Sequence, residues 1–312
     1  MKLYLAPMEG VVDFSMRQMM TSLGGIDLCV TEFIRVTNQL LPDTVFYRYC
    51  PELKTHSKTK YGTTVFIQLL GGDPIALSEN AQKAYELGAA GIDLNFGCPA
   101  KLVNRHDGGA SLLKSPDRIF KIIEKVRAAT PQNIPVTAKI RLGFDDPTIC
   151  IENSLAVEQA GANRITVHCR TKTDMYKPPA YWEWIPKIKE KIKIPVVANG
   201  DIWNENDLLT CQKQTGCEDF MIGRGALRDP YIFQNIKKIE QQNSSPEKLL
   251  LTFFDLNSLD VSPHYAQAKT KQMIKNFSLG KTQLVPLFDE LKIINNPDHF
   301  RATLTQSQHL FS

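Results

Sequence analysis

Short apolar runs alternate along the chain with longer segments whose apolar residues recur at helical spacing. A continuous apolar run of four to six residues predicts a strand that is buried on both faces, as in a parallel sheet. Such runs cover residues 3–6, 28–33, 64–69, 91–95, 136–140, 164–168, 195–198 and 219–222. The spacing between them predicts helices over residues 14–23, 74–87, 116–129, 151–160, 182–191 and 204–214.

Local signals support two of these helices. Ser115 and Pro116 stand where an N-cap and a first-turn proline are expected, and Gly161 directly follows the helix predicted to end at residue 160. Serine before proline favours a helix start, and glycine after the last turn is typical of a C-cap.

Eight strand–helix units in succession predict a (β/α)8 TIM barrel, an α/β fold that usually takes about 250 residues. A doubly wound parallel sheet is the alternative. It is disfavoured because no G-x-G-x-x-G motif follows the first predicted strand.

The composition changes at residues 241–246, a Gln-Gln-Asn-Ser-Ser-Pro stretch that is typical of a linker. Helical patterns follow over residues 247–256, 263–277 and 284–294, and no strand pattern is evident among them. We therefore predict a catalytic barrel over residues 1–243 and a small all-helical domain over residues 244–312.

Composition restricts the class of protein. The chain has 312 residues, 43% of them hydrophobic, and a net charge of +4, which permits a polyanionic partner without requiring one. The seven cysteines include no C-x-x-C pair, so we expect reduced thiols, a cytoplasmic location and no metal site. No apolar run approaches the roughly 20 residues of a membrane helix, and the apolar N-terminus is too short for a signal peptide. The expected state is a monomer.

Active sites of such barrels lie at the carboxyl ends of the strands. Polar side chains at the predicted strand ends are therefore the candidates for chemistry. They are Glu9, Glu32, Arg35, Gln68, Asn95, Cys98, Lys139, Arg141, His168, Arg170, Asn199, Asp201 and Arg224.

Two glycine-containing loops follow the seventh and eighth strands, Asn199-Gly200 and Gly223-Arg224-Gly225. Barrels often bind phosphate at these loops through backbone N–H groups, and Arg224 adds a bidentate donor. The alternative is that the glycines make tight turns and nothing more. Lys139, within an apolar strand, is suited to an anionic cofactor or a Schiff base, or it forms a structural ion pair.

Cys98 lies between Gly97 and Pro99, just after the strand that ends at Asn95. These neighbours restrict the backbone, so the thiol is held at a strand end. A thiol in that place acts as nucleophile, metal ligand or proton donor. Gln68, an amide within an apolar run, needs partners that the edge of a heteroaromatic ring can supply.

Taken together, these stretches resemble the tRNA-dihydrouridine synthase family. The matching segments are residues 5–11 (LAPMEGV), 30–33 (VTEF), 68–69 (QL), 93–101 (DLNFGCPAK), 136–143 (VTAKIRLG), 167–171 (VHCRT), 197–202 (VANGDI) and 221–226 (MIGRGA). Residues 32–36, 39–42 and 50–53 resemble its bacterial C-type branch, which acts on uridine 16 of the tRNA D-loop.

The resemblance implies an FMN-containing barrel that is reduced by NADPH, with a helical tail that binds tRNA. It implies that Cys98 donates a proton to the uracil ring and that Asn95 helps to hold this base. The residues implied to bind FMN are Pro7, Met8, Glu9, Gln68, Lys139, His168, Asn199, Gly200, Asp201, Gly223 and Arg224. The residues implied to contact tRNA, besides Asn95, are Arg35, Asn104, Arg141, Tyr176, Lys269, Lys271, Lys275 and Lys292.

The chain departs from the family's pattern in three places. Lys269 and Lys292 stand where the C-type enzymes tend to have arginine, which removes bidentate recognition. Cys169 replaces a usual glycine, and Arg105-His106-Asp107 occupies the loop after Cys98.

Three other functions are weighed against this one. An FMN barrel that acts on free pyrimidines has no need of a helical tail. A lyase that forms a Schiff base on Lys139 would bind no flavin. A tRNA-binding or chaperone protein without catalysis would not depend on the Cys98 thiol.

Overall fold

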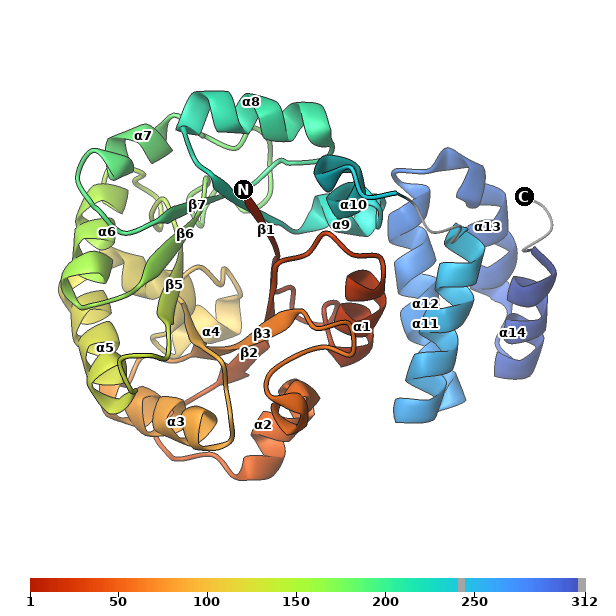
Figure 1. Ribbon diagram of the computed structural model, residues 1–312, viewed down its shortest axis with the longest axis horizontal. Coiled ribbons are helices and arrows are strands. Elements are labelled where there is room, and N and C mark those ends of the chain that lie inside the picture. Colours follow the sequence, from red (N-terminus) through yellow and green to blue (C-terminus); the bar gives the residue numbers. More distant parts are fainter. Residues whose placement is uncertain (241–244, 308–312) are drawn as a thin grey trace. The chain divides into compact units, whose positions relative to one another are not determined.

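The computed structural model describes residues 1–240 and 245–307. Eight parallel strands form a closed barrel in sequence order (Figure 1). The barrel closes because β1 pairs with both β2 and β8, so that Leu5 lies opposite Cys29 and Ile222. The predicted TIM barrel is confirmed. The strands are β1 (Lys2–Leu5), β2 (Leu28–Arg35), β3 (Thr64–Leu70), β4 (Ile92–Asn95), β5 (Val136–Arg141), β6 (Arg164–His168), β7 (Val196–Asn199) and β8 (Asp219–Ile222).

Helices surround this barrel on the outside (Figure 1). Where the helix α3 begins, Asp73 accepts hydrogen bonds from the backbone N–H groups of Ile75 and Ala76 at 2.8 and 2.9 Å, which is a regular N-cap. The helical segments along the barrel are α2 (Asp43–Tyr49), η1 (Pro51–Thr55), α3 (Pro74–Glu86), α4 (Lys101–Arg105), η2 (Gly109–Lys114), α5 (Pro116–Ala129), α6 (Cys150–Gln159), α7 (Trp184–Lys189) and α8 (Glu205–Thr215).

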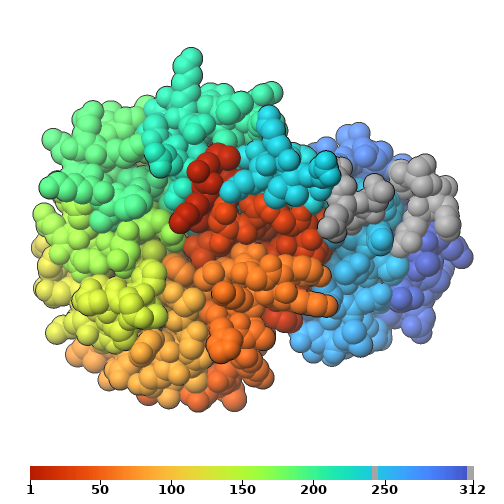
Figure 2. Space-filling model, in the orientation of Figure 1, coloured from red at the N-terminus to blue at the C-terminus, as the bar shows by residue number. Residues whose placement is uncertain are grey.

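In the orientation of Figure 1, the space-filling view shows a closed surface over the barrel (Figure 2). One buried cluster inside the barrel is made of Tyr4, Ala6, Leu28, Val30, Phe66, Val197 and Met221. At Gly91, directly before β4, a Cβ atom would lie 2.4 Å from the Phe66 ring, so only glycine fits there without displacing the ring. The barrel is a packed core that leaves its chemistry to the strand ends.

The described chain forms two compact units. The first comprises Met1–Phe14, Ile26–Ile202 and Asn206–Gly223. The second takes Ser15–Gly25, Trp203–Glu205 and the chain from Arg224 onward. The predicted domain boundary at 243/244 lies within residues 241–244, outside the described residues. The second unit contains most of α1 (Phe14–Ser22) together with α9 (Arg224–Arg228), α10 (Ile232–Lys237), α11 (Pro246–Asp260), α12 (Pro263–Ser278), η3 (Thr282–Leu284), α13 (Val285–Ile293) and α14 (Pro297–Gln306).

Three helices of the second unit start with the same device. Ser245, Ser262 and Asn296 each precede a proline and accept a hydrogen bond from the backbone N–H three residues ahead. An N-cap side chain satisfies an otherwise unpaired N–H, and proline in the first turn has no N–H to satisfy. The sequence therefore fixes where α11, α12 and α14 begin.

Several local predictions need correction. Ser115 makes no side-chain cap, although Pro116 does begin α5. The strands β2 and β7 extend into polar residues, because Arg35 pairs with Leu70 and Asn199 with Met221 in the sheet. The short helices α2, α4, α9 and α10 escaped prediction, since one or two turns carry little periodicity. The ten-residue α14 was also missed.

Within residues 1–240 and 245–307, no helix has the length and apolar character to cross a membrane. The same residues contain no group of three or more histidine, cysteine or acidic side chains arranged to hold a metal ion. All seven cysteines are buried and free of disulfides.

Candidate active site

The loop that carries Cys98 is held by the side chain of Asn95, the last residue of β4. The amide oxygen of Asn95 accepts hydrogen bonds from the backbone N–H groups of Gly97 at 2.9 Å and Cys98 at 3.0 Å. The amide nitrogen of Asn95 donates to Oε1 of Gln68 at 2.8 Å. Both ends of this amide are engaged, so the turn after β4 has a single arrangement.

A second amide holds the same loop from the other side. Asn104 donates through Nδ2 to the carbonyl oxygen of Cys98 at 3.0 Å, and Ala110 donates its backbone N–H to that oxygen at 3.0 Å. Gly109 has φ +60°, and a Cβ there would lie 2.8 Å from the same oxygen. The Oδ1 atom of Asn104 is buried and has no hydrogen-bond partner within the described chain. Asn104, predicted to contact tRNA, thus also positions Cys98.

Burial raises the pKa of the Cys98 thiol above its ordinary value, and the Glu9 carboxylate adds to the rise. Arg141 and Arg35 act in the opposite sense but do not reverse it. The residue is 8% exposed. The thiol therefore keeps its proton at neutral pH, which suits a proton donor rather than a nucleophilic thiolate.

Gln68 lies fully buried beneath this loop. Its Nε2 donates to Asp93 at 2.7 Å, and Asp93 also accepts from the Thr137 hydroxyl. Burial raises the pKa of Asp93. The primary amide of Gln68 retains one N–H and one lone pair beyond these bonds. The predicted contact with a flavin edge remains compatible with this geometry.

Lys139 extends from β5 beside this layer, where it pairs with Asn95 across the sheet. Its ammonium donates to the Oδ1 of Asn199 at 3.1 Å, and the Nδ2 of Asn199 donates to the carbonyl oxygen of Met221 at 2.8 Å. Burial, and secondarily Arg141, lower the pKa of Lys139 to about 8. The cation thus hydrogen-bonds a neutral amide, which leaves its charge uncompensated at that contact.

The end of β6 meets the loop after β7. His168 faces Arg170, whose Nη1 lies 3.3 Å from the imidazole Nε2. Arg170 is fully buried and forms an ion pair with Asp201, which also accepts from the backbone N–H of Ala180 at 2.9 Å. The Asp201 carboxylate is thus committed to holding the Asn199–Asp201 loop.

Glycines let the backbone approach this place closely. Gly200 has φ +125°, and a Cβ there would lie 3.2 Å from Cδ2 of His168. At Gly223, a Cβ would lie 3.5 Å from the sulfur of Met8. Gly223 therefore stands against the chain that leaves β1, where Pro7 and Met8 are half-buried and Glu9 is exposed. A tight turn alone is enough to explain the glycine at position 200. It does not explain the Lys139 ammonium, whose hydrogen-bond partner is a neutral amide.

Arg141 was predicted to contact tRNA, but its side chain is 2% exposed. Its Nε donates to the carbonyl oxygen of Gly97 at 2.9 Å, and its Nη1 donates to those of Thr171 at 3.0 Å and Met175 at 2.8 Å. Its guanidinium lies 5.2 Å from the centre of the exposed Tyr176 ring. Arg141 therefore joins the Cys98 turn to the loop after β6. The exposed group at this place is the Tyr176 ring and not the Arg141 guanidinium.

The residues predicted in the second unit have local partners of their own. Arg224 begins α9, with its guanidinium 5.0 Å from the Trp203 ring. Lys271 donates to the carbonyl oxygens of Lys292 and Ile294 at the end of α13. Lys292 pairs with Asp289 at 2.6 Å, and the Lys269 ammonium lies 5.9 Å from the Tyr265 ring. Lys275 is exposed on α12.

Two residues of the site escaped sequence reasoning. Asp93 and Thr137 form the buried hydrogen-bonded layer under Gln68. An aspartate within an apolar strand is the signal that identifies such a layer, because a buried carboxylate needs donors around it.

The residues present fit a bound flavin nucleotide. Lys139 supplies a partly buried cation without a carboxylate at its hydrogen bond, and Gln68 retains an unused donor and acceptor. Gly200 and Gly223 lie directly after β7 and β8, where barrels often bind phosphate through backbone N–H groups. Cys98 lies on the same rim, so a planar ring there would have a protonated thiol within the same site.

The chain belongs to the dihydrouridine synthase family, whose model matches residues 4–310. It is 45% identical over 311 residues to the tRNA-dihydrouridine(16) synthase of Shewanella oneidensis, with 99% of each chain covered. It is 44% identical to the protein of the same name from Pseudomonas putida, over 94% of this chain and 93% of that one.

Solved structures of barrel proteins share the fold at low identity. Histamine dehydrogenase from Rhizobium sp. 4-9 matches with a TM-score of 0.57 at 15% identity, over 82% of this chain and 49% of that chain. The old yellow enzyme homologue from Zymomonas mobilis matches with a TM-score of 0.54 at 13% identity, over 80% of this chain and 92% of that one.

Proposed function

We propose that this protein reduces the C5–C6 double bond of a uridine in the tRNA D-loop to 5,6-dihydrouridine, at position 16. The observation that carries the proposal is a protonated, immobilised thiol, Cys98, at the end of the strand next to the one that carries Lys139. Relatives that match this chain almost end to end are named for the same position, which supports the choice of uridine 16.

The cofactor is FMN, which when bound supplies the hydride for one carbon of the double bond, and NADPH is its reductant. The proton for the other carbon, C5, comes from the Cys98 thiol. Because the pKa of this thiol is raised, the proton stays on sulfur until the ring accepts it. Lys139 would stabilise negative charge on the cofactor through its partly buried ammonium.

The chain's own residues divide the remaining work. Asn95 fixes the height of Cys98 through two backbone N–H groups and keeps one amide N–H for the base. Gln68 is held by its hydrogen bond to Asp93 and would use its remaining N–H and lone pair to bind the cofactor's ring edge. Asn199, Gly200 and Gly223 offer the phosphate cradle, and Arg170 with Asp201 keeps that cradle in place.

Recognition of tRNA falls to exposed and half-buried residues around the mouth and on the helical tail. Tyr176 is exposed, with its ring tilted 33° to that of His168 at 6.2 Å between centroids, and offers an aromatic face to a base. Arg35, Lys269, Lys275 and Lys292 offer positive charge for phosphates. The target uridine must leave the tRNA fold to reach the site, which costs about a few kcal/mol of stacking.

The protein acts in the cytoplasm as a monomer in this proposal. The seven cysteines are all free, as expected where thiols are kept reduced. A monomer is testable by light scattering of the purified protein.

The experiment is reduction of unmodified tRNA transcripts by the purified protein with NADPH, followed by mapping of dihydrouridine at each position. We expect product at uridine 16, and none from Cys98→Ala, which should still bind FMN and tRNA. Product at another position would reassign the uridine. Equal product from the wild type and Cys98→Ala would remove the thiol from the mechanism. A protein that binds no FMN would overturn the proposal.

A further inference from the structure

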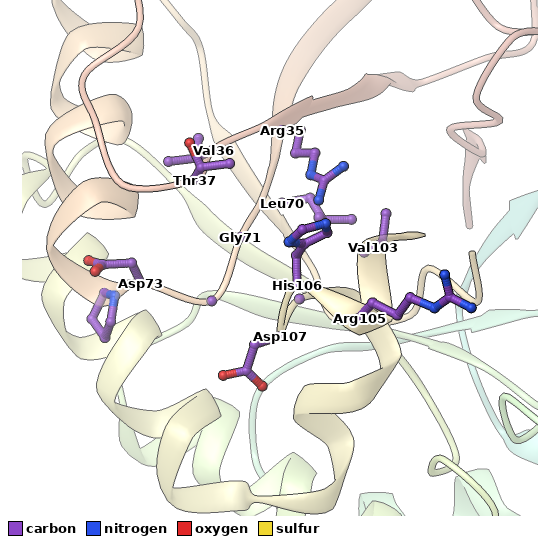
Figure 3. Close-up of a pocket in the computed structure, with 13 residues that line it drawn as sticks. Arg35, Val36, Thr37, Leu70, Gly71, Asp73, Val103, Arg105, His106 and Asp107 are labelled. Carbon is purple, nitrogen blue, oxygen red and sulfur yellow. The ribbon is translucent and has the colours of Figure 1, made fainter. Parts of the chain in front are cut away.

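A pocket of about 500 Å³ opens beside Cys98 in the first unit. Three chain segments line it, the exit of β2 (Arg35–Thr37), the loop from β3 into α3, and the end of α4 through residue 108. In Figure 3, Arg35 extends from the strand toward the ring of His106, and the Arg105 side chain starts near that ring and extends away from it. Two pocket residues, Leu70 and Val103, pack in one cluster with the Cys98 side chain. The pocket therefore adjoins the reacting thiol.

Glycines bring the three segments together. A Cβ at Gly71 would lie 2.5 Å from the carbonyl oxygen of Val36, and one at Gly72 would lie 2.1 Å from that of Asp107. No side chain larger than hydrogen fits at either place without moving backbone. Arg118 fastens the frame from α5, with Nη1 2.7 Å from Asp107 and Nη2 3.3 Å from the carbonyl oxygen of Gly72. These contacts hold the loop that carries Arg105 and His106 in place.

The acidic and the basic side chains of the pocket differ in whether they already have partners. Both of its carboxylates are engaged, since Asp73 caps α3 and Asp107 pairs with Arg118. The Arg118 pair also lowers the pKa of Asp107, so that carboxylate stays ionised. In the described residues, the side chains of Arg35, Arg105 and His106 form no hydrogen bond or ion pair. The pocket therefore offers unused donors to a ligand and no unused carboxylate.

We propose that Arg105 and His106, together with Arg35, bind one phosphate group of the RNA substrate in this pocket, adjacent to the reacting uridine. The inference rests on the proposed function, because it identifies the occupant as a phosphodiester of the same RNA strand. Arginine supplies a forked pair of N–H donors for phosphate oxygens, and imidazole supplies a further N–H. The flanking position follows from the cluster shared with Cys98, which must itself reach the uracil ring.

Phosphate of NADPH is the other source of the same chemistry. The RNA is favoured because the pocket adjoins the thiol that must touch the base, and the strand continues from the base on both sides. A phosphate contact weakens RNA binding across sequences when it is removed, and it lowers the dependence of binding on salt. These two readouts separate the sources.

The experiment measures the Kd of purified unmodified tRNA for the FMN-loaded protein across a range of KCl concentrations. The variants are Arg105→Gln, His106→Gln and their combination, with Arg105→Lys as the charge-retaining variant. Lys125→Gln is the control, because Lys125 is exposed on α5 outside the pocket and its loss removes one charge as well. FMN absorbance and thermal unfolding establish that each variant is folded.

We expect the Kd of the double variant to rise about tenfold and the slope of log Kd against log salt to fall by about 0.7–0.9. Arg105→Lys should retain the slope, and Lys125→Gln should change neither quantity. If the wild type forms dihydrouridine but the double variant has an unchanged Kd and slope, the phosphate site in the pocket is overturned and the proposed function still stands. A raised KM for NADPH with unchanged tRNA binding would assign the pocket to the cofactor and overturn the RNA contact. A wild type that forms no dihydrouridine would overturn both this inference and the proposed function.

Discussion

The side-chain oxygen of Asn95 lies 3.0 Å from the backbone nitrogen of Cys98 and accepts its hydrogen bond. The same oxygen accepts from Gly97, so one amide fixes both residues that precede Pro99. Asn95 was expected to hold the uracil base. The geometry gives it an earlier task, which is to set the position from which the thiol delivers its proton.

Replacement of Asn95 by alanine should slow dihydrouridine formation by about 10- to 100-fold, because small displacements of a reacting group cost rates of that order. FMN binding should persist. The measurement is single-turnover reduction of tRNA by the pre-reduced protein. Gln82→Ala is the control, since Gln82 is exposed on α3 and bonds to Glu86. A normal rate in Asn95→Ala would show that the turn holds Cys98 without this amide.

The raised pKa of Cys98 predicts slow alkylation at neutral pH. The rate of iodoacetamide labelling at Cys98, followed by mass spectrometry of its peptide, should rise about tenfold per pH unit from pH 7 to 9, because the thiolate is the reactive form. Glu9→Gln should label faster than the wild type at each pH, since Glu9 helps to raise the pKa. Labelling that is already complete and independent of pH at 7 would indicate a thiolate and contradict the acid role.

The lowered pKa of Lys139 predicts how the affinity for FMN depends on pH. Its pKa is lowered to about 8 in the free protein, and an anionic partner favours the protonated form. Binding therefore takes up a proton above pH 8, and the Kd for FMN should rise by up to about tenfold per unit until the pKa of the complex is reached. Below pH 8 the Kd should be flat. Fluorescence titration of the apoprotein measures this.

Lys139→Arg is the matched variant, because arginine stays charged over the whole range. We expect its Kd for FMN to be independent of pH between 7 and 9.5. An identical pH slope in the wild type and in Lys139→Arg would assign the dependence to another group.

Replacement of Arg141 should lower the free energy of unfolding and leave the charge on the protein surface unchanged, because this side chain is buried. Arg141→Met leaves the carbonyl oxygens of Gly97, Thr171 and Met175 without their donor, and the expected loss is about 2–4 kcal/mol of unfolding free energy. Urea unfolding followed by circular dichroism measures it. Arg48→Met, at an exposed position of α2, should change stability by no more than about 0.5 kcal/mol. Equal stability of both variants would contradict the bridging role of Arg141.

The sequence predicted the barrel well because the strands are short, largely apolar runs between polar turns. It placed Arg164–His168 and Asp219–Ile222 at their observed bounds. The strand-end rule then found Gln68, Asn95, Cys98, Lys139 and Asn199 without any view of the fold. Hydrogen bonds join Gln68, Asn95 and Cys98 in one group and Lys139 with Asn199 in another, and Lys139 pairs with Asn95 in the sheet.

What the sequence did not provide is which polar group is already in use. Arg141 and Asp201 both have the chemistry of ligand-binding residues, yet each is occupied by protein groups brought from distant positions. Such pairings depend on loops whose paths carry no periodicity. The pocket beside Cys98 was missed for the same reason, since Gly72 and Asp107 meet only once the barrel has formed.

The second unit draws α1 from near the start of the chain and the rest from beyond residue 223. In that unit, Gln234 donates to the carbonyl oxygen of Leu23, and a Cβ at Gly25 would lie 2.7 Å from the backbone of Phe233. During synthesis, α1 therefore waits for about 200 further residues, which at ribosomal rates is about 10–40 s. Because each unit is built from separate segments of the chain, no single cut separates the two units. Truncation at residue 245 would remove α11 to α14 and leave α1, α9 and α10 without the rest of their unit.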